Sequence, residues 1–269
     1  MLRRPVDVRR GPTGWYAETL EDALAQEVPV ALVYNGISHA VMMASPADLE
    51  DFALGFSLSE GILAHRHECY DLEVRQEPQG LAVHLTIASQ RLAELKARRR
   101  SLAGRTGCGL CGTEALEQAI RPIPPVQAPT LPDAAIQRAL AGLAKHQILQ
   151  AATGATHGAA WCDGLGRIQL VREDVGRHNA LDKLIGALSR QDGLEASGFV
   201  LVSSRASYEM VHKSASVGIG ALVAVSAATA LAVEQAQAAG LLLVGFARPG
   251  RHLIYHCPKA VPLEARAPA

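Results

Sequence analysis

Short apolar runs that alternate with glycine-ended segments constrain the fold of this chain more than any other feature. The segments between the runs have the length of helices, and they end at Gly218 and Gly240, as helices often do. Strands that are apolar along their whole length need cover on both faces, so the pattern predicts a parallel sheet between layers of helices. The uncharged window 214–233 then belongs to this α/β unit and is not expected to span a membrane. The runs are FVLVSS, ALVAVS and LLLVGF, at residues 199–204, 221–226 and 241–246.

Three loops follow the strands of this predicted sheet. Right-handed crossovers bring them to the same carboxyl edge, which is the usual ligand site of such sheets. The loops carry hydroxyls, glycine and the basic side chains Arg205, Arg248 and Arg251, and arginine forks suit phosphates or a guanine edge. Strand-end caps and an ordinary surface turn would explain the same residues almost equally well. The loops span residues 203–205, 226–229 and 246–251.

The N-terminal part predicts a smaller α+β unit between Val30 and Ser89. Strand-like runs, VPVALVYNG, VMMAS and LAVHLTIAS, surround the helical run ADLEDFALGFSLSEGIL. Ser45 is expected to cap that helix, and Pro46 to occupy its first turn.

A connector is expected to follow this unit, at residues 91–132, because its C-terminal part is rich in proline. A helix of about residues 133–149 comes next. We therefore predict an N-terminal domain at residues 1–121 and a C-terminal domain at 122–269.

The sharpest local motif is Gly107-Cys108-Gly109-Leu110-Cys111-Gly112. Glycines around two thiols remove side-chain cover, and nearby arginines favour thiolate over thiol, so the motif predicts a nucleophilic sulfur. Sulfur or acyl carriage is the favoured chemistry. A redox dithiol and half of a zinc site are the alternatives, although the other cysteines, Cys69, Cys162 and Cys257, stand singly in the sequence.

A second group of polar residues comprises residues 153–157 and 172–179, just before the run NALDKLIGAL. Acids, arginines and the histidines His157 and His178 gather there against the start of a predicted amphipathic helix, whose free amides could accept an anion. The alternative is structural: Asp174 caps the helix or pairs with Arg177, and His178 is an interior residue.

Composition narrows the possible partners and the compartment. Lys and Arg total 26, as do Asp and Glu, so the chain lacks the basic excess of a general nucleic-acid binder. No apolar stretch follows the N-terminal arginines, so neither a signal peptide nor a membrane anchor is expected. The odd number of cysteines, 5, does not suggest a disulfide framework, and a reducing, cytoplasmic setting is expected.

Together these motifs resemble the FdhD/NarQ family of formate dehydrogenase accessory sulfurtransferases, over roughly Val30 to His256. The matching segments occur in the family's order: RTGCGLCG, TGATHGAAW, REDVGRHNALDKLIG, LVSSRASYEMVHKSA, AVSAATALAVE and LVGFARPGR. The resemblance implies a sulfur carrier that accepts sulfane sulfur from a cysteine desulfurase and passes it to the molybdenum or tungsten cofactor before insertion into apo formate dehydrogenase. By position, Cys108 would hold the persulfide, and Cys111 would assist as a second carrier or as the resolving thiol.

The resemblance also implies a binding site for the bis(molybdopterin guanine dinucleotide) cofactor, which a guanine nucleotide such as GDP would share. It implies a homodimer as well, with a C-terminal domain of cytidine-deaminase-like α/β/α fold beside a smaller α+β domain. Deaminase chemistry is not expected, because no glutamate stands two places after His157 and the cysteine pair lies upstream. A cofactor-binding chaperone without sulfur transfer is the alternative function. The matching cofactor stretch is Phe246, Ala247, Arg248, Pro249, Gly250 and Arg251, with His157, Ser204, Arg205 and Thr229 as further candidates and no metal ligand.

Overall fold

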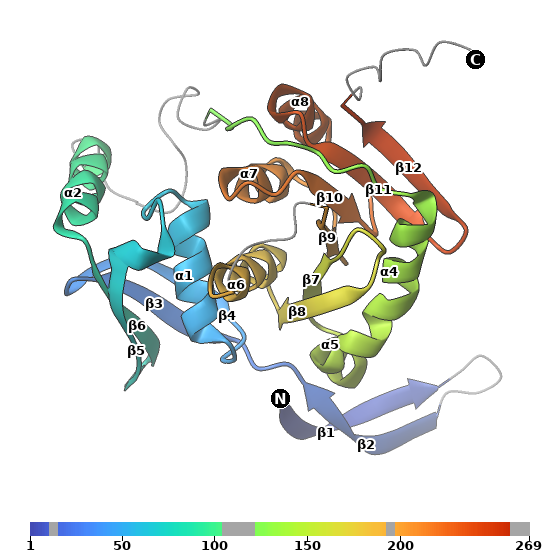
Figure 1. The fold of residues 1–269 in the computed structure, drawn as a ribbon. Coiled ribbons are helices and arrows are strands. Elements are labelled where there is room, and N and C mark those ends of the chain that lie inside the picture. Colours follow the sequence, from blue (N-terminus) through green and yellow to red (C-terminus); the bar gives the residue numbers. More distant parts are fainter. Residues whose placement is uncertain (11–15, 104–121, 192–196, 259–269) are drawn as a thin grey trace, which may run out of the picture.

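A computed structural model describes residues 1–10, 16–103, 122–191 and 197–258 of the chain (Figure 1). It is a mixed α/β structure whose described part contains a 6-stranded, a 4-stranded and a 2-stranded sheet. The largest sheet belongs to the C-terminal part. Its strands, in spatial order, are β12 (Arg251–His256), β11 (Leu242–Arg248), β10 (Ala221–Ala224), β9 (Phe199–Val202), β7 (His157–Cys162) and β8 (Ile168–Asp174).

The three apolar runs form β9, β10 and β11, which are parallel as predicted. Three further strands that the pattern did not include, β7, β8 and β12, extend the sheet and make antiparallel pairs. Tight turns explain the pairs β7–β8 and β11–β12, because a hairpin needs only a few residues whereas a parallel return needs a crossover. Asp163 organises the turn between β7 and β8, since its Oδ1 accepts hydrogen bonds from the backbone N–H groups of Leu165 and Arg167.

Helices cover both faces of the large sheet, as predicted (Figure 1). One face packs on α6 (Arg177–Ser189), α7 (Tyr208–Ser216) and α8 (Ala230–Ala239), and the other on α4 (Asp133–His146). The single helix expected at 133–149 is instead interrupted at Gln147, whose φ of −91° and ψ of 79° are not helical. The short helix α5 (Ile148–Thr153) follows and ends at Gly154, which has a φ of 65°.

The N-terminal sheet has the strand order β4 (Ile37–Ala44), β3 (Val28–Tyr34), β6 (Gly80–Ile87) and β5 (Cys69–Glu77). It packs on α1 (Leu49–Ser59) and α2 (Ser89–Ala103), with the short 3-10 helix η1 (Arg66–Glu68) before β5. The expected strands and helix are present. Edge strand β5 was not predicted, because its charged residues, all exposed, hide any apolar alternation.

Two further expectations for this region are wrong. Helix α1 starts later than predicted, after Asp48, and Ser45 does not cap it. Ser45 instead donates its backbone N–H to Asp174 Oδ2, and its hydroxyl accepts from the backbone N–H of Val175. The expected connector 91–132 begins inside α2, and among its described residues those from 122 to 132 lack helix and strand.

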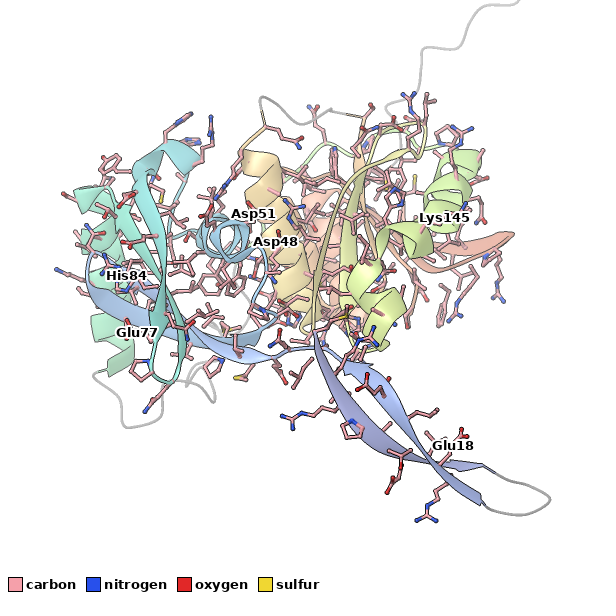
Figure 2. The ribbon with its side chains drawn as sticks, turned by 90° about the horizontal axis from the view of Figure 1, so that it is seen from below. Glu18, Asp48, Asp51, Glu77, His84 and Lys145 are labelled. Carbon is pink, nitrogen blue, oxygen red and sulfur yellow. The ribbon has the colours of Figure 1, made fainter. Side chains whose placement is uncertain are left out.

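Strands β1 (Leu2–Arg10) and β2 (Tyr16–Leu24) form an antiparallel hairpin that projects from the body of the molecule, with Glu18 on its arm (Figure 2). The sequence analysis assigned no structure to these residues.

Helices α1 and α6 join the N-terminal and C-terminal parts at a close crossing (Figure 1). A Cβ atom at Gly55 would collide with the backbone carbonyl of Asp182, and one at Gly186 with that of Asp51. Figure 2 shows Asp48, just before α1, and Asp51 on α1, facing the C-terminal part. Asp51 Oδ2 accepts from both Nε (2.9 Å) and Nη2 (2.8 Å) of Arg172 on β8. The domain boundary at 121/122 stays a prediction.

The prediction that α6 is amphipathic is wrong. All of its residues from Asn179 to Leu188 are buried, because the helix lies between α1 and the large sheet. Two charged side chains inside this stretch, Asp182 and Lys183, are therefore buried as well, and each needs an ionic partner.

Candidate functional site

The carboxyl edge of the parallel strands brings the predicted loops together in one row. The backbone N–H of Phe246 donates to the carbonyl of Ser226 (2.9 Å), and that of Ser226 to the carbonyl of Ser204 (3.3 Å). Ser203 continues the row, since its N–H donates to the carbonyl of Gly158 (2.9 Å) and its Oγ accepts from the Gly158 N–H (2.9 Å). The row therefore runs from β11 across β10 and β9 to the start of β7.

The candidate stretch Phe246–Arg251 forms the end of β11, a turn and the start of β12. Arg248 and Arg251 pair across the Pro249–Gly250 turn, and both are exposed. Gly250 has a φ of 74°, which favours glycine, and its N–H donates to Gln137 Oε1 on α4 (2.8 Å). The structure thus fixes the turn to α4 and leaves the two guanidinium groups facing solvent.

Phe246 has an unusual backbone for its residue type, with a φ of 46° in the left-handed region. Its side chain is 37% exposed, although Ala247 beside it is completely buried. Such backbone strain persists only where the surroundings enforce it, here the hydrogen bond to Ser226. The effect is an aromatic ring presented at the carboxyl edge.

Of the other predicted cofactor-binding residues, Ser204, Arg205 and Thr229 lie in the loops after β9 and β10. Ser204 is buried and donates its hydroxyl to the carbonyl of Arg205 (3.0 Å). Thr229 caps α8, because its hydroxyl accepts from the backbone N–H of Ala232 (3.3 Å). Arg205 is exposed beside them. Ser204 and Thr229 therefore have structural roles, and a contact with ligand stays a prediction for all three.

The fourth candidate, His157, is half-buried at the start of β7. Burial lowers the pKa of His157 below the ordinary histidine value of 6.5, and the positive charges of Arg177 and His178 lower it further. Arg177 and His178 begin α6, whose N-terminal dipole adds positive potential. This end of the row therefore favours an anionic or electron-rich ligand.

Two buried donors near α6 and α7 have no hydrogen-bond partner in the described part of the chain: Nε of Arg177 and Oγ of Ser207. Ser207 stands at the N-cap of α7, yet its hydroxyl accepts no capping hydrogen bond. Buried polar groups are normally paired, so groups left unpaired at a helix N-terminus favour an anion-binding role. Ser207 was not among the sequence candidates, and no motif distinguishes it.

The rest of the second polar group is structural. Asp174 does not pair with Arg177, because its carboxylate bonds Lys183 Nζ at 2.7 Å and both side chains are fully buried. The N-cap of α6 is Gly176. His178 Nε2 lies 2.7 Å from Glu209 Oε2 of α7. The structural interpretation thus holds for Asp174, although with a partner the sequence analysis did not name.

A cavity of about 420 Å³ opens beside His157, between α5 and β7. Gln147 lines it from the break between α4 and α5, and its side chain is buried, at 6% exposure. Gln147 Nε2 has no hydrogen-bond partner among the described residues. Sequence reasoning missed this residue, since a glutamine within a helical run carries no signal. The other lining residues with polar side chains are Gln150, Thr156, His157 and Ser203.

A larger cavity, of about 670 Å³, lies at the opposite, amino edge of the parallel strands, near the ends of α1, α6 and α7. Its lining is largely apolar, with His65, Arg66, His67 and Arg91 beside it. Pro124 also lines it.

The predicted sulfur nucleophile, Cys108, and its neighbour Cys111 lie outside the described residues. The described cysteines, Cys69, Cys162 and Cys257, form no disulfide. No group of three or more potential metal ligands of the His, Cys, Asp or Glu type occurs within residues 1–10, 16–103, 122–191 and 197–258. None of the described helices combines the length and apolar character that crossing a membrane requires.

Comparison with known proteins places these features in a family. The chain is 59% identical over 249 residues to the sulfur carrier protein FdhD of Cupriavidus necator, covering 91% of this chain and 85% of that protein. It is 54% identical over 250 residues to the sulfur carrier protein FdhD of Variovorax paradoxus, covering 93% and 90%.

Similarity extends to a solved structure. The crystal structure of a proposed formate dehydrogenase accessory protein from Desulfotalea psychrophila has the same fold, with a TM-score of 0.75 at 24% identity over 96% of this chain and 99% of that one. The model of the FdhD/NarQ family matches residues 25–262. The resemblance found in the sequence motifs is thus confirmed, and the chain belongs to the FdhD/NarQ family.

Proposed function

We propose that this chain is a sulfur carrier that serves formate dehydrogenase and transfers sulfur to the bis(molybdopterin guanine dinucleotide) cofactor. The observation that carries the proposal is the 59% identity, over 91% of the chain, with a protein named sulfur carrier protein FdhD. In this proposal a cysteine desulfurase is the sulfur donor and apo formate dehydrogenase receives the cofactor. The family's homodimer, cytidine-deaminase-like domain and cytoplasmic setting are parts of the same proposal.

The first proposed step is persulfide transfer. The thiolate of Cys108 attacks the outer sulfur of the desulfurase persulfide, an S–S bond forms at Cys108, and the desulfurase cysteine leaves as a thiolate. The sulfur moves as neutral sulfane, so no external oxidant or reductant is needed. Glycines on either side of Cys108 leave its sulfur open to attack.

The second proposed step releases sulfide to the cofactor. Cys111 attacks the sulfur of Cys108 that carries the persulfide, a disulfide forms between the two residues, and the outer sulfur leaves as sulfide. The two thiol groups supply the two electrons that reduce sulfane sulfur to sulfide. A cellular thiol reductant then returns the disulfide to the dithiol.

The substrate site in this proposal is the carboxyl edge. The residues present fit the phosphates and guanine of the dinucleotide, because Arg205, Arg248 and Arg251 are exposed in the loops of this edge and Arg177 and Ser207 have buried donors without a partner among the described residues. Arginine and backbone N–H groups hold phosphate, and Phe246 offers a ring against which a base can stack.

Intact-protein mass spectrometry after incubation with a cysteine desulfurase and cysteine tests the sulfur-carrier role. Wild type is expected to gain one sulfur atom that a thiol reductant removes, and Cys108→Ala to gain none. Cys257→Ala is the matched control, because Cys257 is an exposed cysteine outside the motif, and it should behave as wild type. An adduct on Cys108→Ala would contradict the carrier assignment. No adduct on any variant would leave a cofactor-binding chaperone without sulfur transfer.

A further inference from the structure

The cavity between α5 and β7 is lined by Gln147, a buried glutamine whose amide nitrogen lacks a partner among the described residues. Gln147 is buried, yet its Nε2 donates no hydrogen bond within the described part of the chain. Burying an amide without a partner costs free energy, so such a group in a cavity wall indicates a missing acceptor. Gln147 lines the cavity of about 420 Å³, where a ligand could supply that acceptor.

Local structure holds this amide in place. The helix break at Gln147 turns its side chain inward, and its backbone carbonyl accepts from Ala151 to start α5 (2.9 Å). The side chain lies against Gly158 of β7, where a Cβ atom would be 2.7 Å from Nε2. Glycine at position 158 therefore leaves the space that the amide occupies.

The neighbouring polar groups are already paired with one another. Glu173 accepts from the backbone N–H groups of Leu149 and Gln150, both at 2.8 Å, and from the hydroxyl of Thr156 at 3.2 Å. Gln150 Oε1 accepts from the backbone N–H of Thr156 (2.8 Å). These bonds engage Gln150 and Thr156 of the cavity lining, whereas Gln147 Nε2 has no partner among the described residues.

The lining of this cavity offers a ligand hydrogen bonds and no ion pairs. The residues around the cavity offer an amide, an imidazole and a hydroxyl, at Gln147, His157 and Ser203, and its lining includes no Asp, Glu, Lys or Arg. A glutamine amide pairs with a lactam through two hydrogen bonds, because Nε2 donates to the ring carbonyl and Oε1 accepts from the ring N–H. The 2-amino-4-oxopyrimidine ring that presents such a lactam is common to pterins and guanine.

Position favours the pterin over the guanine. The row of hydrogen-bonded loops separates Phe246 on β11 from Gly158 on β7 by three strand spacings, or about 14 Å. If the guanine end of a dinucleotide lies at Phe246–Arg251, its pterin end lies farther along the row, toward His157. We propose that Gln147 binds the lactam edge of the cofactor's pterin in this cavity, an inference that rests on the proposed function.

A fluorescence titration tests this pairing with 6-carboxypterin as the probe, since pterins are fluorescent. The Gln147→Met variant keeps the size of the side chain and removes both hydrogen-bonding atoms. Its affinity for the probe is expected to be lower by roughly 10- to 100-fold, the usual value of a bidentate pair. Gln90→Met is the matched control, because Gln90 is exposed on α2 and bonds only Glu94 in the described part, and it should bind as wild type does.

A second probe separates lactam recognition from general loss of shape. In 3-methyl-6-carboxypterin a methyl group replaces the ring N–H, so Gln147 Oε1 would have no donor and the methyl group would block the lactam edge. Wild type should bind this analogue about as weakly as Gln147→Met binds 6-carboxypterin, and Gln147→Met should bind the two probes equally. Equal binding of both probes to wild type would overturn the proposal.

Further outcomes distinguish this inference from the proposed function. If Gln147→Met weakens GDP and leaves 6-carboxypterin unchanged, the cavity takes guanine and the pterin assignment is overturned. If the variant changes neither while wild type still binds GDP, the inference fails and the proposed substrate site stands. If wild type binds neither GDP nor 6-carboxypterin, both fail.

The stability of the variant is a second readout. Removing an unpaired donor should leave the melting temperature of the ligand-free protein unchanged or higher, whereas removing a structural hydrogen bond would lower it. Should Gln147→Met fail to fold, Gly158→Ala serves instead, because its methyl group would displace the amide. The same loss of 6-carboxypterin binding is expected from it, and undiminished binding would overturn the proposal.

Discussion

The junction of α1 with α6 and the carboxyl edge of the large sheet both bury polar groups, but they treat them differently. At the junction two buried lysines each have a carboxylate partner: Lys183 bonds Asp174 at 2.7 Å, and Lys213 of α7 bonds Asp182 at 3.0 Å. At the carboxyl edge, donors of Gln147, Arg177 and Ser207 lack partners among the described residues. Paired groups hold the structure together, and unpaired donors indicate where a ligand completes it.

The pairing at the junction also controls protonation. Burial alone would lower the pKa of Lys213, but the carboxylates of Asp182 and Glu60 outweigh it, and the pKa of Lys213 is raised. Lys213 donates to Glu60 Oε1 (2.8 Å) and Ser59 Oγ (3.0 Å), and its ammonium lies 5.2 Å from the centre of the Phe56 ring. Side chains from α1, α6 and α7 therefore share one charged cluster.

The largest expected effect comes from breaking a pair at the junction. Lys183→Met leaves Asp174 buried without its cation, and losing one partner of a buried ion pair costs about 3–5 kcal/mol. Urea unfolding followed by circular dichroism measures the loss. Lys145→Met is the control: Lys145 is exposed on α4 (Figure 2), and its loss should change the unfolding free energy by less than about 0.5 kcal/mol. Similar values for the two variants would refute the role given to the buried pair.

A smaller effect is expected at the helix crossing itself. Gly186→Ala would place a methyl group against the backbone carbonyl of Asp51, and overpacking of this kind costs about 1–3 kcal/mol. Gly142→Ala in α4 makes the same change where the new methyl would meet only the flexible end of Ile168, at 3.2 Å. It should be neutral or stabilising, since alanine favours helix over glycine. A melting curve of each variant checks the prediction, and equal melting temperatures would contradict it.

The sequence predicted the helices and strands whose apolar residues follow a regular local pattern. It did not predict burial that depends on packing against an element distant in the chain. Strands β9, β10 and β11 and the helix ends at Gly218 and Gly240 follow from local apolar runs and glycines. The meeting of the three loops at the carboxyl edge follows from the common direction of these parallel strands. By contrast, α6 looked amphipathic because Asp182 and Lys183 are charged, and only the packing of α1 shows that both are buried.

The candidate site shows the same limit. The stretch Phe246–Arg251 could be proposed from the sequence because arginine, proline and glycine follow a strand. Gln147 and Ser207 could not, because their distinguishing property is the absence of a partner within the described fold. Whether a polar side chain has a hydrogen-bond partner depends on the tertiary structure, so no sequence motif predicts it.

The pH dependence of stability should show a modest contribution from the edge. The pKa of His157 is lowered in the folded protein from 6.5, so the unfolded chain takes up a proton first as the pH falls. His157 therefore contributes stability that is present above pH 6.5 and is lost as the pH falls through its lowered folded-state pKa. Unfolding free energies measured between about pH 8 and pH 5 should decline less in His157→Gln than in wild type, because the variant lacks this linked protonation. An unchanged pH profile would show that the folded protein does not perturb this imidazole.

The smallest expected effect is the difference between removing a hydroxyl without a described partner and removing one that accepts a hydrogen bond. Ser207→Ala removes a buried hydroxyl that has no partner in the described part of the chain, so the unfolding free energy should change by less than about 0.5 kcal/mol. Ser45→Ala removes a hydroxyl that accepts from the Val175 N–H at 3.1 Å, and should cost about 0.5–1.5 kcal/mol. Calorimetric titration with GDP then separates the two, because only Ser207→Ala should weaken binding if that hydroxyl faces a phosphate. If Ser207→Ala destabilised the protein as much as Ser45→Ala, its hydroxyl would have a protein partner, and the contrast between junction and edge would fail at this residue.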